Sequence, residues 1–115
     1  MINRHGPTAI MHRVVRHGDT LYLGGIIAPD LTQGIGGQTT QILDRIAALL
    51  AEVGSDKSHI LAATIYITDM SLKAEMNAAW TGWFAPQDLP TRATIGVSDL
   101  GPDTLLEVVV TAVMA

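Results

Sequence analysis

Two charged residues, Arg92 and Glu107, stand out because each interrupts a largely aliphatic segment of the chain. A charge among aliphatic side chains needs an opposite charge, a neutral form or a wet cavity. A guanidinium group binds a carboxylate through two parallel hydrogen bonds. A partly buried carboxyl group can pass protons near neutral pH. Arg92 and Glu107 together therefore suit a small anionic substrate whose reaction needs proton transfer.

Hydrolysis of an imino acid would use both groups. Arg92 would hold the substrate carboxylate, and Glu107 would orient or deprotonate the water that attacks the imine carbon, after which ammonia leaves. The pattern has a purely structural alternative as well. The two residues could form a structural ion pair, or Arg92 could reach solvent from the end of its strand.

Other kinds of chemistry find little support in the sequence. The absence of cysteine excludes disulfides, thiolate metal sites and a cysteine nucleophile. The histidines lack the paired spacing of a zinc site, and the glycine-rich residues 34–37 lack the Lys-Ser/Thr of a phosphate loop. We therefore expect neither a metal nor a cofactor. Trp80 and Trp83 are expected in the core or at an interface.

The charge of the chain bears on its partners and its location. A net charge of −4 and a pI near 5.3 argue against nucleic acid, which prefers a basic face. The one basic cluster, Arg13, Arg16 and His17, is interpreted as a solvated edge. No run of eighteen apolar residues is present, and residues 1–7 lack the apolar centre of a signal peptide. We expect a cytoplasmic protein without a membrane span.

Turn residues divide residues 1–115, a single predicted domain, into short elements. The segment His17-Gly18-Asp19 separates apolar runs at 10–16 and 20–28, which predicts a hairpin. A helix follows the glycines at 34–37, because its apolar residues recur every three or four positions. Gly54 stands where a left-handed helix cap would lie.

The second half predicts a strand at 60–68, a helix from about Leu72 to Trp83, and strands at 91–97 and 105–114. The order ββαβαββ predicts an α+β two-layer domain with one sheet of five or six strands and two helices on one face. The last strand is apolar on both faces. Two helices cover only one face, so the other cover must come from another copy of the chain.

Several segments in order resemble motifs of one protein family. Residues 18–25 (GDTLYLGG), 60–70 (ILAATIYITDM) and 76–80 (MNAAW) resemble its second strand, a central strand and a helix. Residues 89–97 (LPTRATIGV) resemble its P-x-R-x-x-V-x-V segment, and residues 105–113 (LLEVVVTAV) resemble its closing x-V-E-I-x-x-x-A strand. From about Met11 to Ala115, the chain resembles the Rid (YjgF-type) family of imine and enamine deaminases.

This resemblance implies a chorismate-mutase-like fold and a homotrimer with a central β-barrel and sites between subunits. It also implies hydrolysis of small imino and enamino acids to 2-keto acids and ammonia. Arg92 falls on the family's carboxylate-binding arginine and Glu107 on its water-handling glutamate. Asn77 falls on a position that lines the cleft, and Gly25 and Thr94 fall on positions whose backbone faces the ligand.

The sequence departs from the family pattern at three positions. Met11, Gly24 and Ile26 stand where the family usually has tyrosine, serine and glutamine, which predicts a drier cleft. The alternative function is therefore a non-catalytic, small-carboxylate-binding or regulatory trimer. Ribonuclease activity has also been attached to this family, but the acidic balance and the lack of a histidine pair disfavour it here. Chorismate mutase activity shares only the fold.

Overall fold

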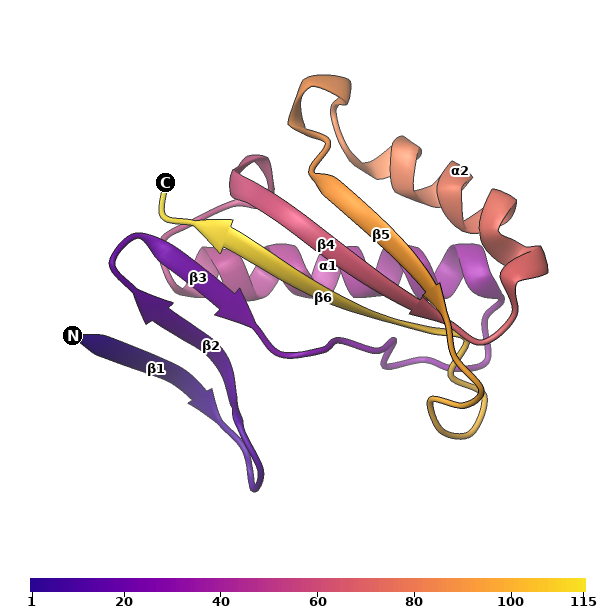
Figure 1. Ribbon diagram of the computed structural model, residues 1–115, viewed down its shortest axis with the longest axis horizontal. Helices are drawn as coiled ribbons and strands as arrows, with labels where there is room; N and C mark the ends of the chain where they lie inside the picture. Colours follow the sequence, from indigo (N-terminus) through magenta and orange to yellow (C-terminus); the bar gives the residue numbers. More distant parts are fainter.

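The structure, a computed structural model, describes residues 1–115 as a six-stranded sheet with two helices on one face (Figure 1). The strands have the spatial order β1-β2-β3-β6-β4-β5. Only β4 and β5 are parallel; the other neighbours are antiparallel. The elements are β1 (Ile2–Pro7), β2 (His12–His17), β3 (Thr20–Leu23), α1 (Ile35–Glu52), β4 (Ile60–Ile67), α2 (Lys73–Trp83), β5 (Thr91–Gly96) and β6 (Leu106–Val113). The predicted α+β two-layer architecture is confirmed.

The N-terminal strand β1 was not among the predicted elements. It pairs antiparallel with β2, with His5 opposite Val14, and forms one edge of the sheet (Figure 1). Its sequence, INRHGP, lacks the alternation that marks a half-buried strand. The start predicted for the next strand, residue 10, was also wrong, because the amide of Thr8 donates to the carbonyl of Met11 (2.8 Å) in a turn that precedes β2.

The strand predicted at 20–28 is regular only to Leu23. Tyr22 lies opposite Thr111, but Ile26 lies opposite Val108. The chain thus advances four residues from Tyr22 to Ile26, whereas the paired strand advances only three. The one extra residue is a β-bulge. The bulge lies at Gly24 and Gly25. It turns Ile26, which is 8% exposed, toward the helices together with Val108.

Helix α1 supplies much of the core through one apolar face. Its fully buried aliphatic residues include Ile42, Leu43, Ile46, Leu49 and Leu50, spaced as one stripe of a helix. The helix ends in a left-handed cap at Gly54, whose φ is +89°. The amide of Ser55 then donates to the carbonyl of Leu50 (2.9 Å), as in a Schellman-type cap. The predicted role of Gly54 is confirmed.

The side chains of the closing strand β6 alternate between the two faces of the sheet. Leu106, Val108, Val110 and Ala112 are at most 2% exposed and belong to the core under the helices. The alternating residues Glu107, Val109, Thr111 and Val113 are half-buried on the opposite face. Both helices lie on the first face, so within one chain the second face, called here the open face, has no helical layer. No helix in the structure is long and apolar enough to span a membrane.

A turn before β4 carries a strongly hydrogen-bonded carboxylate. Oδ1 of Asp56 accepts from the Ser58 hydroxyl (2.5 Å), the Ser58 amide (2.9 Å) and Nδ1 of His59 (2.8 Å). These bonds, the Ser58 hydroxyl foremost, lower the pKa of Asp56 from 3.8 to about 2. The ionised form therefore favours folding at pH values above 3.8, and this contribution is lost as the pH falls through about 2.

We predict that Ser58→Ala raises the pKa of Asp56 toward its ordinary value, because the strongest donor is removed. An NMR titration of the Asp56 carboxyl carbon measures this shift. Ser71→Ala is the matched control, since Ser71 donates to Asp69 in the same way and lowers the pKa of that carboxyl group instead. An unchanged midpoint for Asp56 in Ser58→Ala would contradict the prediction.

Candidate functional site

Arg92 is held between β5 and α2 by two side chains of the helix. Its Nη2 donates to Oδ1 of Asn77 (2.6 Å). Its guanidinium carbon lies 5.3 Å from the ring centre of Trp80, within the range of a cation–π interaction. Asn77 and Trp80 are three residues apart, so they share one face of α2. One helical turn thus fixes the plane of the guanidinium group.

The Arg92 guanidinium has no carboxylate partner in the chain. The ion pairs of the structure join His5 to Glu52, Arg16 to Asp19 and His59 to Asp56. Arg92 is nevertheless half-buried, and burial lowers its pKa; an arginine retains its charge despite such a shift. The cation and most of its five N–H donors are therefore left for an outside anion. An intramolecular ion pair does not explain this residue.

A cavity of about 350 Å³ opens beside Arg92. It is lined by Asn77, Trp80, Thr81, Leu89, Pro90 and Arg92. Thr94 follows two positions after Arg92 on β5, so the two side chains share a face of the strand. The structure thus brings together two predicted site residues, Arg92 and Asn77, and places Thr94 on the same face of β5, the edge strand of the sheet (Figure 1).

Glu107 lies on the other face of the sheet. It pairs with Tyr66 across β4 and β6, and its side chain points to the open face, whereas Arg92 contacts α2 on the helix-covered face. Glu107 forms no side-chain hydrogen bond or ion pair within the chain. The two residues first singled out in the sequence therefore do not meet within one chain. They can act on one ligand only if two chains contribute.

The bulge in the chain after β3 makes room for the Glu107 carboxyl group. A Cβ atom added to Gly25 would lie 2.9 Å from Cδ of Glu107, so a larger residue there would displace the Glu107 carboxyl group from its present position. A Cβ on Gly24 would lie 2.9 Å from Sδ of Met11. Met11, Gly25 and Ile26 line one cavity of about 210 Å³ with Arg13, Ile27, Pro29 and Arg45. Two predicted site residues, Gly25 and Glu107, thus lie together as a second cluster, and Gly25 also shares a cavity with Met11.

Ile26 contributes to this cavity in a different way from Met11. Its side chain is packed in the core opposite Val108. Where the family pattern usually has glutamine, Ile26 therefore adds an apolar side chain to the core and also makes the cavity less polar. Met11 is 40% exposed and supplies a flexible apolar wall beside Gly24.

We predict that Gly25→Ala lowers any turnover that depends on Glu107, while the melting temperature changes little. The new methyl group would meet the mobile end of Glu107, which can swing away without disturbing the backbone. Kinetics and thermal unfolding on the same preparation measure the two effects. Gly36→Ala in α1 is the control, since a Cβ there meets nothing within 4 Å. Unchanged turnover in Gly25→Ala would show that the position of Glu107 is unimportant.

Trp80 is the site residue that the sequence analysis missed. It was expected in the core or at an interface, and at 3% exposure it is a core residue. The same ring also lies under Arg92. The sequence did contain one signal for this role. Trp80 lies three residues after Asn77 in a helix, and the next strand carries the unpaired Arg92.

Comparison with known proteins gives a consistent result. The model of the family described as Endoribonuclease L-PSP matches residues 1–114. A RutC family protein from Haemophilus ducreyi is 37% identical over 112 residues, which are 97% of this chain and 96% of that protein.

Solved structures show the same fold. A member of the YjgF protein family from Neisseria meningitidis is 34% identical, with a TM-score of 0.95 over 100% of this chain and 96% of that one. The Rid family protein YyfA from Yersinia pestis, of unknown function, is 29% identical, with a TM-score of 0.87 over 94% and 90% of the two chains. These likenesses confirm the predicted chorismate-mutase-like fold.

Proposed function

Because this chain belongs to the YjgF/Rid family, also described as Endoribonuclease L-PSP, we propose that it hydrolyses small imino and enamino acids to 2-keto acids and ammonia. The observation that carries the proposal is the Arg92 guanidinium: half-buried, oriented by Asn77 and Trp80, and without a carboxylate partner in its own chain. Such a group favours binding a ligand carboxylate through two parallel hydrogen bonds.

In the proposed reaction, Arg92 holds the substrate carboxylate and so fixes the adjacent imine carbon. Thr94 and Gly25 border the ligand through their backbone. Asn77 acts through Arg92: its amide oxygen accepts one guanidinium proton and leaves the remaining donors directed at the carboxylate. No metal or cofactor takes part in the proposed steps.

Glu107 handles the water. Its carboxylate takes a proton from a water molecule as the oxygen bonds to the imine carbon and passes that proton to the nitrogen, so the C=N double bond becomes a single bond to an amino group. The tetrahedral intermediate then collapses: Glu107 takes the hydroxyl proton as the carbonyl of the keto acid forms and gives it to the nitrogen as the C–N bond breaks, and ammonia leaves. An enamine enters the same sequence after protonation of its carbon has converted it to the imine.

The proposed site is shared by two chains. Arg92, Asn77 and Thr94 would come from one subunit, and Glu107 and Gly25 from its neighbour, because the two clusters lie on different faces of the sheet. The neighbour would also cover apolar groups of the open face, including Val109, Val113 and Tyr22, which is 52% exposed. We propose a homotrimer, whose cyclic symmetry would form three such sites.

The test is a panel of imino acids generated in situ, such as 2-iminopropionate, with ammonia release measured with and without the protein. We expect the protein to accelerate release for at least one small substrate. A panel without acceleration by the wild-type protein would contradict the deaminase proposal.

The second candidate is a non-catalytic carboxylate-binding trimer. It is favoured by the apolar wall at Met11 and by Gly24, which offers no side-chain hydroxyl. A 2-keto acid or benzoate would then raise the melting temperature without turnover; at about 100 times Kd the stabilisation would be ~2.7 kcal/mol. The ribonuclease activity in the family description has no such support, since the chain is acidic and no histidine lies in either cluster.

A further inference from the structure

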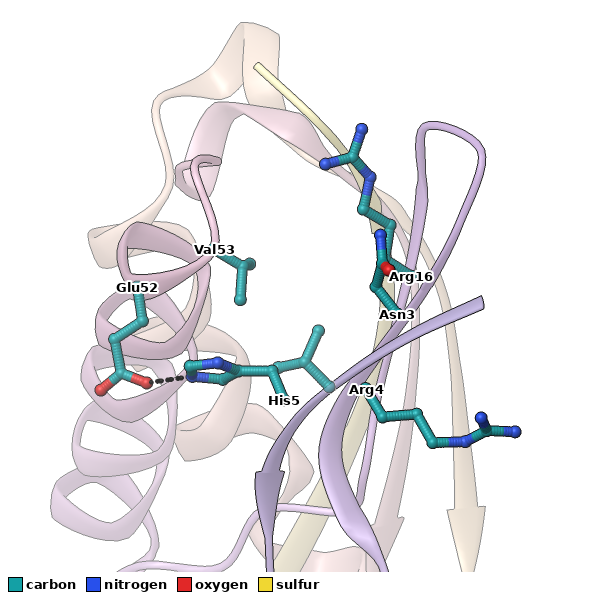
Figure 2. A pocket seen from close by; sticks show the side chains of 7 residues that line it. Asn3, Arg4, His5, Arg16, Glu52 and Val53 are labelled. Atoms are coloured by element: carbon teal, nitrogen blue, oxygen red, sulfur yellow. Dashed lines mark hydrogen bonds and ion pairs between the residues drawn. The ribbon is translucent and has the colours of Figure 1, made fainter. Parts of the chain in front are cut away.

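A separate cavity of about 280 Å³ lies between the β1–β2 hairpin and the C-terminal end of α1 (Figure 2). Its lining residues are Asn3, Arg4, His5, Val14, Arg16, Glu52 and Val53. The Arg4 side chain points away from it, on the opposite side of β1 from His5 (Figure 2). None of these residues belongs to the Arg92 or Glu107 cluster.

One end of this cavity attracts positive charge. Glu52 is the last residue of α1, and its Oε2 lies 2.9 Å from Nε2 of His5. The carbonyl end of a helix carries a partial negative charge, and the last turn of α1 contains no basic residue. Half of the Glu52 side chain is exposed, so its carboxylate can accept further hydrogen bonds from a ligand ammonium group.

The other end presents hydrogen-bond donors. The Nε of Arg16 donates to the carbonyl of Gly18 (2.8 Å), which anchors the side chain. Its Nη2 is 3.8 Å from Oδ1 of Asp19, too far for a hydrogen bond. The terminal nitrogens therefore keep free N–H groups. Figure 2 shows Arg16 and Asn3 on the hairpin side of the cavity, across from Glu52.

We propose that this cavity binds a free α-amino acid as its zwitterion. The carboxylate binds Arg16 and Asn3, the ammonium group binds Glu52, and the side chain packs against Val14 and Val53. Opposite charges at the two ends select a ligand that carries both charges. A simple carboxylate or a simple amine satisfies only one end. The site is distinct from the proposed deaminase site and stands independently of it.

The test is an NMR titration of the wild-type protein with glycine, alanine and valine, using acetate and methylamine as singly charged controls. We expect amide shifts of residues 3–5, 14–16 and 52–53 with the amino acids, and weaker binding of either control. Arg16→Gln and Glu52→Gln should each weaken amino-acid binding about 3- to 10-fold, as expected for half-exposed charge pairs.

Two further variants make the result decisive. Arg92→Ala should leave these shifts unchanged, because Arg92 lines the cavity beside α2 and not this one. Arg16→Lys keeps the charge and should retain more affinity than Arg16→Gln, which separates charge recognition from a folding defect. The proposal is overturned if the amino acids produce no shifts at these residues, if acetate binds as well as alanine, or if both neutral variants bind like the wild type.

Discussion

Replacing Arg92 with alanine should lower kcat/KM of the proposed deaminase reaction with 2-iminopropionate by about 100- to 1000-fold, which corresponds to the loss of two charge-assisted hydrogen bonds to the substrate carboxylate. The fold should survive, because Arg92 forms one side-chain hydrogen bond within the chain and no ion pair. Ammonia release from the imine generated in situ measures the change.

Two controls distinguish the bidentate hydrogen bonding of Arg92 from the effect of its positive charge. Arg92→Lys retains a cation but cannot form the bidentate contact, so its activity should fall between those of the wild type and Arg92→Ala. Lys73→Ala, which removes an exposed cation at the start of α2, should have wild-type kinetics. An Arg92→Ala protein with undiminished kcat/KM would exclude carboxylate binding by this residue.

Mixing two inactive variants should restore activity. Arg92→Ala and Glu107→Gln damage different halves of the proposed site, and the two halves lie on different faces of each chain. In trimers assembled from equal amounts of both, a site is intact only when one neighbour supplies Arg92 and the other supplies Glu107. Random assembly makes about one quarter of the sites intact, so we expect about one quarter of wild-type activity.

The experiment requires joint refolding or co-expression with two affinity tags, so that the variants share trimers. Each variant refolded alone should remain inactive, and so should a mixture of separately assembled variants. Recovery in the jointly assembled sample supports a site made by two chains. No recovery in verified mixed trimers would show that Arg92 and Glu107 do not share a site across the interface.

Much of the fold could be predicted from periodicity. The helix stripes and the alternation of β4 and β6 report directly on burial, and Gly54 marks a helix end through its backbone conformation. Strand β1 could not be predicted, because an edge strand paired to a single neighbour buries few side chains and therefore needs no apolar alternation. Its evidence is backbone pairing with β2, which the residue types do not reveal.

The sequence proposed the members of the candidate site but could not predict how they are arranged. Arg92 and Glu107 each break an apolar pattern, so the sequence identified them individually. Their positions on opposite faces depend on the register in which β5 and β6 pair with β4, which no local pattern records. Trp80 was missed because a core tryptophan and a tryptophan beneath a guanidinium group have the same helical spacing.

The extra residue at Gly24 and Gly25 has a consequence for insertions and deletions in this chain. A single-residue deletion there would restore a regular ladder between Tyr22 and Ile26 rather than merely shorten a connection. Ile26 would stay opposite Val108 in the core, but the bulged glycine backbone that lies against the Glu107 carboxyl group would be lost. We expect lineages related to this chain to tolerate length changes at the 8–11 turn far more readily than at these two glycines.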